Sequence, residues 1–326
     1  MEIAAIGTTK TGELTPPSVE TITWNGLTWV YIERPTRKEV DYLAQSYPFF
    51  HTLNLDDTLS RIQLPKIDEY DDYIFVVLHF PVFNKESRVT MASEVDFFVG
   101  KDFVVTIHCA GDLKPLSTLF KDCQIHTELR ERNMGKGPGY LFYRITDSLV
   151  DYCFPILSKV IDNVEKVEDR VFTAPVPQTV QEIMIVRRDL LSLRRIVRPE
   201  IPVMQQLEQG NRPYLGEDLD VYFGDIGDHL NKIWHTLEEY KDIVESLTDT
   251  SNWLTQHRMQ EIMRVLTIFM AIVMPLTFIT SIYGMNIRLP LGLEERGGWA
   301  GFVALMGVMV LVTVGILAFF RRKRWL

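Results

Sequence analysis

The sequence predicts an α+β multi-domain membrane protein, and three observations support this fold class. Two apolar runs without a charged residue, 265–283 and 298–320, are each long enough to cross a bilayer as a helix. Strand-like and helix-like segments alternate before residue 130, which is typical of an α/β layer structure. After the glycine-rich stretch 135–139 the pattern is helical. The expected parts are a cytoplasmic α/β domain at 1–134, long stalk helices at 135–262 and a transmembrane domain at 263–326.

The α/β domain is expected to begin with a polar arm, residues 1–20, and a β-hairpin. Asn25-Gly26 is a strong turn signal between the β-prone segments 21–24 and 28–33. Thr36, followed three residues later by Glu39, forms a capping box that predicts a helix to about Tyr47. The remaining expected elements are a short helix at 55–61 and strands at 73–83, 95–99 and 103–108.

The chemistry-bearing side chains of this domain do not indicate a catalytic centre. His79 and His108 lie in apolar strand segments and are interpreted as buried structural residues. There is no nucleotide-binding loop, Ser-His-Asp order or Cys/His metal cluster, so an enzyme is not expected. Cys109, Cys123 and Cys153 are odd in number and widely spaced, which suits a reducing compartment.

The stalk is expected to consist of long amphipathic helices. One is predicted from 140 to about 172, where Ala174-Pro175-Val176-Pro177 stops it, and a return helix at 179–197 is expected to end at Pro199. From about Gly216 the helical pattern continues through the first apolar run, which would make a helix of roughly 100 Å. A helix of that length must pack against neighbours from its own or other subunits.

The charges near the C-terminus predict the membrane topology. Arg321-Arg322-Lys323-Arg324 follows the second apolar run, so the positive-inside rule places this end in the cytoplasm. Two spans return the N-terminal body to the same side, leaving only a short outer loop at about 285–297. No cleaved signal is expected, because the N-terminus has no basic segment followed by an apolar one. The predicted location is the inner (plasma) membrane, with lipid as a partner.

The formal net charge is −9, and the acidic excess lies before residue 287. An acidic body concentrates divalent cations, although a routine acidic domain explains the same balance. Nucleic acid is not expected as a partner, since there is no basic stripe with interleaved aromatic residues.

An unusual stripe runs along the helix that contains the first span. Its amide, thioether and hydroxyl side chains recur alternately four and three residues apart, which is the period of a supercoiled seam. Such groups are costly against lipid, so the stripe should face either a packed helix or water. The water-filled alternative is a pore lined by one helix from each of several subunits. With Leu266 and the preceding Asp249, the candidate pore-lining residues are Asp249, Gln260, Met263, Leu266, Thr267, Met270, Met274, Thr277 and Ser281.

The end of this stripe carries a resemblance to a known family. Tyr283-Gly284-Met285-Asn286 at the outer end of the first span, Met274-Pro275-Leu276-Thr277-Phe278 before it, and a basic C-terminus ending Arg-Trp-Leu resemble the CorA family of divalent-cation channels. The resemblance extends over essentially the whole chain and is strongest after residue 250. It implies a homo-oligomer of five subunits that moves Mg²⁺ passively into the cytoplasm, with Co²⁺ and Ni²⁺ as further ions. Mg²⁺ would be both substrate and regulatory ligand, with no other cofactor.

The chemistry of hydrated Mg²⁺ suits an amide at this position. Mg²⁺ holds its waters tightly and releases them reluctantly, so an entrance can recognise the hydrated ion through its outer waters. A ring of Asn286 carbonyl oxygens accepts hydrogen bonds from those waters without the tight binding of carboxylates. The resemblance assigns ion selectivity to Gly284, Met285 and Asn286, and Met263, Leu266 and Met274 could form apolar constrictions that gate by dewetting.

The resemblance also implies a regulatory cation site between subunits. Asp225 matches the Asp near the start of the long helix, and the neighbouring subunit's ligand is expected just beyond the 73–83 strand. Here that position is Asn84, with Glu86 nearby. Because Asn84 is neutral, the site has one charge fewer unless Glu86 supplies it.

Two other functions remain open. A zinc transporter of the same superfamily is the nearer one, although such relatives usually vary the Met that is intact here at Met285. A membrane-anchored sensor or scaffold without transport is the other, and ion flux into liposomes would distinguish it from a channel.

Overall fold

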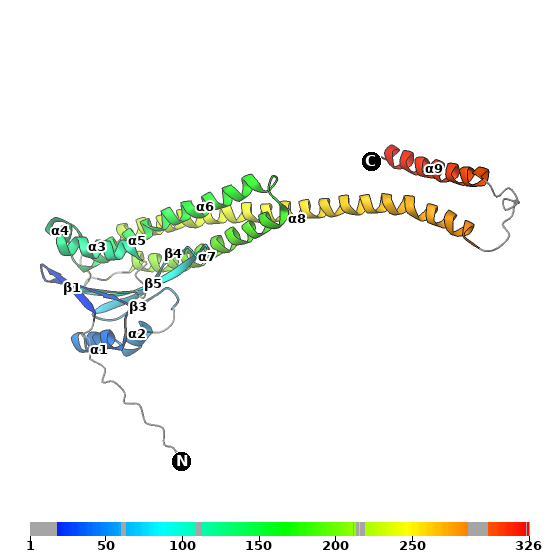
Figure 1. The fold of residues 1–326 in the computed structure, drawn as a ribbon. Helices are drawn as coiled ribbons and strands as arrows, with labels where there is room; N and C mark the ends of the chain where they lie inside the picture. Colours follow the sequence, from blue (N-terminus) through cyan, green and yellow to red (C-terminus); the bar gives the residue numbers. More distant parts are fainter. Residues whose placement is uncertain are drawn as a thin grey trace, which may run out of the picture. The chain divides into compact units, whose positions relative to one another are not determined.

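The computed structural model describes residues 18–59, 63–108, 113–210, 212, 215, 219–285, 299–323 and 325. The chain divides into two compact units, Met1–Thr248 and Asp249–Leu326, which are described separately below. The first contains a sheet with helices on both faces, and the second contains the later part of one long helix and a final apolar helix (Figure 1). The predicted fold class is confirmed.

A six-stranded sheet organises the first unit, with strand order β1-β2-β6-β5-β4-β3. All neighbouring strands are antiparallel except β2 and β6, which are parallel. The parallel pairing requires a crossover, which residues 34–102 between β2 and β6 provide. The strands are β1 (Val19–Trp24), β2 (Leu27–Glu33), β3 (Lys66–Glu69), β4 (Tyr73–Asn84), β5 (Val89–Gly100) and β6 (Phe103–His108).

Local signals near the N-terminus act as predicted. Asn25 and Gly26 both have positive φ, 48° and 83°, as a two-residue hairpin turn between β1 and β2 requires. Thr36 caps α1 (Arg37–Ser46), and Glu39 returns to the Thr36 backbone, so the capping box is confirmed. His79 and His108 are buried, as expected, with 7% and 1% of their surfaces exposed.

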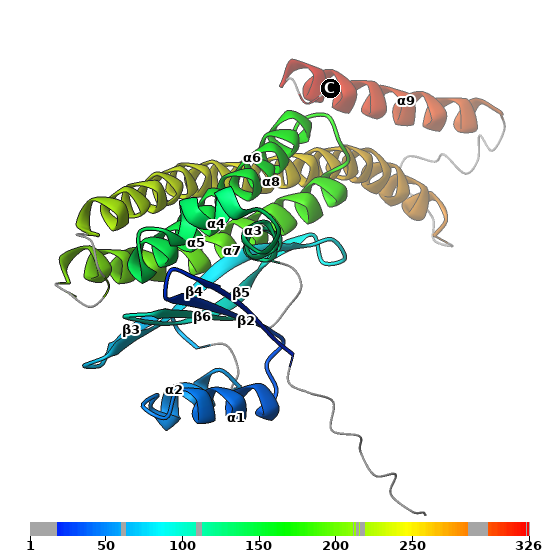
Figure 2. The same ribbon diagram turned by 90° about the vertical axis from the view of Figure 1, so that its left-hand side faces the viewer.

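The two faces of the sheet carry separate apolar cores, and Figure 2 shows helices on both sides of the sheet. The alternation of side chains along each strand separates them, since Ile74, Val76 and Leu78 face one way and Phe75 and Val77 the other. The short helices α1 and α2 (Thr52–Asp57) cover the second face. The first face is covered by α3 (Lys114–Ile125), α4 (Thr127–Met134), α5 (Pro138–Asp151), α6 (Cys153–Arg170), α7 (Val176–Gln209) and the start of α8.

Helix α7 crosses the ribbon formed by the far ends of β4 and β5. Asp189 Oδ1 accepts the Thr90 N–H at 2.5 Å, and Ser192 Oγ donates to the Thr90 carbonyl at 2.6 Å. At the other edge of the ribbon, Glu200 Oε1 accepts the His79 N–H at 2.6 Å. Side chains of α7 thus satisfy backbone groups that no neighbouring strand pairs with.

Several helix predictions were wrong in extent, for identifiable reasons. The helix expected over 140–172 is divided at Tyr152 into α5 and α6, because Pro155 has no N–H to offer the carbonyl of Asp151. The return helix was expected to end at Pro199, yet α7 continues through Pro199 and Pro202 to Gln209. Tertiary packing outweighs the proline cost there. Helices α3 and α4 and strand β3 were not anticipated, and β5 begins six residues earlier than expected.

The predicted long helix is confirmed as α8 (Asp220–Tyr283), which has 64 residues. Its beginning, which belongs to the first unit, buries Phe223, Ile226, Leu230 and Ile233 at helical spacing. Polar contacts add to this packing: the Arg194 guanidinium pairs with Glu238 and lies over the Trp234 ring. The last helix is α9 (Trp299–Arg322). Both α8 and α9 contain a segment apolar enough to cross a membrane, and none of either segment is buried within the chain.

Candidate functional site

All nine predicted pore-lining residues lie on α8 and are exposed in the single chain. They run from Asp249 to Ser281, and the exposed fraction reaches 76% at Met274. This exposure includes large apolar side chains that a soluble surface does not ordinarily gather in one place. The stripe therefore lacks a packing partner within the described part of its own chain.

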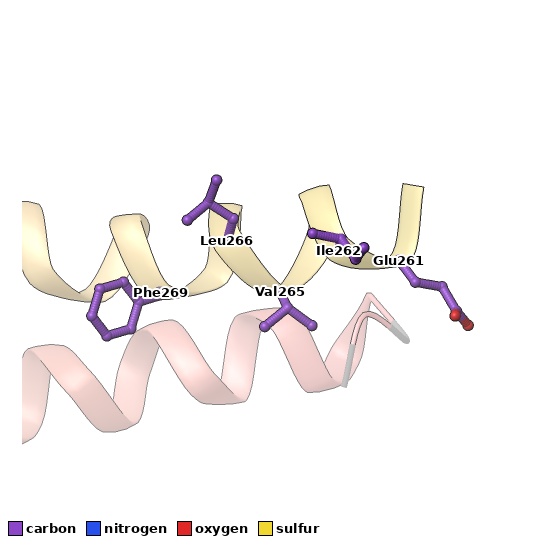
Figure 3. A pocket seen from close by; sticks show the side chains of 5 residues that line it. All are labelled: Glu261, Ile262, Val265, Leu266 and Phe269. Atoms are coloured by element: carbon purple, nitrogen blue, oxygen red, sulfur yellow. The ribbon is translucent and has the colours of Figure 1, made fainter. Parts of the chain in front are cut away.

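The side chains that line a hollow beside α8 indicate which way the stripe faces (Figure 3). It is lined by Glu261, Ile262, Val265, Leu266 and Phe269. Val265 and Phe269 point towards the neighbouring helix α9, whereas Leu266 points away from it. At about 100° per residue, the centre of the stripe lies roughly 140° around α8 from the mean direction of Val265 and Phe269. The polar stripe is therefore directed away from the second apolar helix of the same chain.

The hydroxyl groups of the stripe are oriented by the helix itself. Thr267 Oγ1 donates to the Met263 carbonyl at 2.7 Å, and Thr277 Oγ1 donates to the Val273 carbonyl at 2.9 Å. Such back-bonding satisfies a hydroxyl in an apolar surrounding. It also leaves the oxygen lone pairs as acceptors, the groups that the waters of a hydrated cation require.

The outer end of α8 is described only as far as Met285. Gly284 N–H still donates to the Thr280 carbonyl at 2.9 Å, and its φ is not positive. A Cβ at Gly284 would lie 3.4 Å from that carbonyl oxygen, at the limit of ordinary contact. The single chain therefore contains no special backbone conformation that explains this glycine. Asn286 and the expected outer loop lie outside the described residues.

A second group of functional side chains was missed by sequence reasoning. Asp147 and Asp151 on α5 and His229 on α8 place one ligand atom each within 4.8 Å of one another. Asp225 precedes His229 by one helical turn, so two i, i+4 pairs from separate helices meet here. The signal was present only as two separate spacings, with no sequence feature to connect them across some 80 residues. This group is called the α5–α8 cluster.

The electrostatics of the α5–α8 cluster favour a cation. Burial and the nearby Asp151 carboxylate raise the pKa of Asp147, although Arg144 and His229 oppose the rise. Arg144 Nη1 holds one Asp147 oxygen at 2.9 Å, leaving the other oxygen available. His229 Nδ1 is buried and has no hydrogen-bond partner among the described residues. Two carboxylates and an imidazole suit Co²⁺, Ni²⁺ or Zn²⁺ directly and hydrated Mg²⁺ through its waters.

The other predicted regulatory residues lie at the turn between β4 and β5. Asn84 Oδ1 accepts the N–H groups of Glu86 and Ser87 at 2.9 and 3.0 Å, which closes this turn. Glu86 is exposed. Among the described residues of one chain, neither Asn84 nor Glu86 forms a hydrogen bond or ion pair with Asp225. Their role as ligands from a neighbouring subunit stays a prediction.

Comparison with known proteins identifies the relatives of this chain. Residues 24–322 match the family described as CorA-like Mg²⁺ transporter protein. The cobalt/magnesium transport protein CorA of Thermotoga maritima is 31% identical over 92% of this chain and 83% of its own. The zinc transport protein ZntB of Yersinia pseudotuberculosis is 20% identical over 91% and 88%. The complete CorA structure from Methanocaldococcus jannaschii superposes with a TM-score of 0.79 at 22% identity, covering 97% of each chain.

Proposed function

The chain belongs to the CorA-like Mg²⁺ transporter family, and on that premise we propose that it is a homo-oligomeric channel for Mg²⁺ uptake. Five subunits form the assembly, both termini lie in the cytoplasm, and the spans cross the inner membrane. Mg²⁺ moves passively inward, with Co²⁺ and Ni²⁺ as further ions. No catalysed reaction and no resident cofactor are part of this function.

The observation that supports this proposal most is the orientation of the stripe on α8. Gln260, Thr267, Met274 and Thr277 are exposed. Helical geometry places them away from the side of α8 on which Val265 and Phe269 point towards α9. Two spans per chain cannot enclose a path, and polar side chains directed at lipid are costly. Assembly of several copies around an axis removes this cost, because the stripes of all copies then surround one water-filled path.

Ion selection in this proposal takes place at the outer end of α8. Gly284, Met285 and Asn286 form the entrance, where a ring of amide oxygens receives the hydrated ion. The oriented oxygens of Thr267 and Thr277 provide further acceptors along the path. Met263, Leu266 and Met274 supply apolar constrictions that close when they dewet.

Regulation is proposed to act through the α5–α8 cluster together with Asp225. A cytoplasmic cation held by Asp147, Asp151 and His229 would join α5 to α8, the helix that also carries the pore-lining stripe. A ligand shifts a conformational equilibrium only by its difference in affinity between the two states. We therefore infer that the closed state holds this cluster together and that the open state separates it.

Flux measurement in proteoliposomes tests the proposed function. Purified full-length protein is reconstituted, and entry of Mg²⁺, Co²⁺ and Zn²⁺ is followed at several internal Mg²⁺ concentrations. The expected result is entry of Mg²⁺ and Co²⁺ that declines as internal Mg²⁺ rises. Entry of Zn²⁺ alone would support the zinc transporter, and no entry of any ion into liposomes containing intact oligomer would support the scaffold.

A further inference from the structure

A wide groove lies where α7 packs beside the β4–β5 hairpin and the first part of β5, and of its lining residues only Asn84 is among the predicted site residues. Its volume of about 980 Å³ is at the upper end of the range for small-molecule sites. Figure 2 shows the hairpin and α7 side by side. The groove is lined by Asn84, Ser87, Val89, Thr90, Met91, Ala92, Met184, Ile185, Arg187, Arg188, Leu191, Ser192 and Arg195. We call it the α7 groove.

The α7 groove has an unbalanced positive charge. Arg187, Arg188 and Arg195 are exposed along its α7 wall, and none of them has an ion pair or hydrogen bond among the described residues. No carboxylate is among the lining residues. The nearest acid on α7, Asp189, is buried and holds the Thr90 N–H. Three guanidinium groups are thus gathered in a groove whose described lining contains no carboxylate.

The β5 wall adds a backbone donor to these side chains. The Thr90 N–H and carbonyl are directed away from β4, because both bond to α7 side chains. Successive backbone groups alternate in direction, so the Ala92 N–H is directed the same way. The strand register is consistent with this direction, because Ala92 lies opposite Pro81, which has no N–H to donate to Ala92.

The same geometry excludes an extended peptide as the occupant. A strand added to an edge needs a continuous row of outward-facing backbone groups. On β5 that row is interrupted at Thr90 by α7 and ends at Val95, where pairing with β6 begins. The row left between these two positions is too short for a strand, so only a small ligand can use the Ala92 N–H.

The apolar lining indicates that such a ligand has a flat or apolar part. Met91 and Met184 flank the groove with 54% and 57% of their surfaces exposed. Flexible thioether side chains adapt to ring-shaped ligands. Guanidinium groups match phosphate oxygens in a two-pronged geometry that a lysine cannot provide.

We propose that the α7 groove binds a phosphate-bearing small molecule of the nucleotide class. Its phosphates contact Arg187, Arg188 and Arg195, and its ring lies against Met91 and Met184. This site is separate from the stripe and from the α5–α8 cluster, so its occupancy can be measured without ion flux.

Calorimetry on the full-length protein in detergent, with EDTA present to remove divalent cations, tests this proposal. The probes are ATP, ADP, adenosine and inorganic phosphate. We expect ATP and ADP to bind with one site per chain and inorganic phosphate to bind far more weakly. Each single substitution, Arg187→Gln, Arg188→Gln or Arg195→Gln, should weaken ATP binding by about tenfold, since a charge-assisted hydrogen bond is lost.

Matched variants distinguish a built site from general attraction to positive charge. Arg132→Gln removes an exposed guanidinium on α4, away from the groove, and should leave ATP binding unchanged. Arg188→Lys keeps the charge but loses the planar fork, and should weaken binding nearly as much as glutamine. Equal effects of Arg132→Gln and Arg188→Gln would overturn the proposal. Absence of ATP binding to the wild-type protein would also overturn it. A third contrary result would be groove variants that only dissociate the oligomer, because the arginines would then pair with acidic residues of a neighbouring chain.

Discussion

The two units of this protein use the same apolar residue types in opposite ways. In the first unit, Trp29, Phe97 and Phe142 are completely enclosed between sheet and helices. In the second, Ser251 and Phe320 are the only buried residues among those described, and side chains such as Phe269 and Met274 are exposed. Apolar area removed from water stabilises a fold by about 25 cal/mol per Å². The first unit obtains this stabilisation within one chain, and in the proposed assembly lipid and other copies supply it to the second.

This contrast teaches where function can be located. A closed core such as that around Phe142 leaves no space for an ion, and changes there act on folding. An uncovered surface such as the α8 stripe contributes little to the stability of one chain, so in the proposed channel its composition is free to follow the needs of ion passage. Mutations in the core of the first unit should therefore lower the free energy of unfolding, whereas mutations in the stripe should change ion flux.

The largest expected effect is at Asn286. We expect Asn286→Ala to abolish Mg²⁺ uptake while the first unit stays folded, because the substitution removes the amide oxygens that receive the hydrated ion. Flux into proteoliposomes measures uptake, and size-exclusion chromatography measures assembly. A normally assembled variant that still conducts Mg²⁺ selectively would show that Asn286 does not form the entrance.

The next prediction concerns the core of the first unit. Phe142 is fully buried and packs against Phe97 and Phe223, with ring centroids 5.0 and 5.3 Å away. We expect Phe142→Ala to lower the free energy of unfolding by about 3–5 kcal/mol. Met274→Ala, a similar truncation in the second unit, should cost less than about 1 kcal/mol. Urea unfolding of the full chain in detergent compares them, and equal losses would contradict the contrast between the units.

Charges placed on opposite sides of α8 sharpen the contrast within the second unit. Leu266→Asp and Met274→Asp should raise Mg²⁺ flux several-fold at high internal Mg²⁺, because a charge keeps an apolar constriction wet. Val265→Asp, on the side that faces α9, is the matched control and should lower the amount of assembled protein without raising flux. If Val265→Asp and Leu266→Asp behave alike, the stripe packs against a helix and lines no path.

A moderate effect is expected at the α5–α8 cluster. Asp147→Asn and Asp225→Ala should each raise the internal Mg²⁺ needed for half-closure about tenfold, because a carboxylate near the ion is lost. Asp162→Asn, on the exposed surface of α6, is the control and should leave the midpoint unchanged. Asn84→Asp should lower the midpoint if a neighbouring chain's Asn84 completes the site. Unchanged midpoints for Asp147 and Asp225 would place the sensor elsewhere.

The smallest predicted effect is a pH dependence at Glu200. Complete burial raises the pKa of this carboxyl well above its usual value. Above the ordinary glutamate pKa of about 4.3, the folded state retains a proton that the unfolded state has lost, so stability falls as pH rises. Glutamine cannot ionise and its carbonyl oxygen still accepts the His79 N–H. The Glu200→Gln variant should therefore be about as stable as wild type near pH 5 and more stable near pH 8. Melting temperatures of the two proteins that change with pH in parallel would refute this.

Much of the fold could be predicted because its signals are local. The Asn25-Gly26 turn, the Thr36 capping box and the apolar run of β4 depend on neighbouring residues, and all three are confirmed. The continuation of α7 through Pro199 could not be predicted. It depends on packing with β4 and β5, about a hundred residues earlier in the chain.

The candidate sites divide in the same way. The stripe could be predicted because its residues follow a single helical period on α8, although its function as a pore remains a proposal. The α5–α8 cluster could not be predicted, because Asp147 and His229 become neighbours only when two helices that are distant in the sequence pack together. The α7 groove likewise requires α7 and β5 to be placed together.

The contacts between α7 and the β4–β5 ribbon have a consequence for biosynthesis. Thr90 and Asp189 are 99 residues apart, and His79 and Glu200 are 121 apart. At roughly 5–20 residues per second on the ribosome, about 5 to 20 s pass before α7 follows the ribbon. During that interval the ribbon exposes unpaired backbone groups, which invite association with other nascent chains. Synthesis of this protein should therefore depend on chaperones during this interval, well before the first membrane span has been translated.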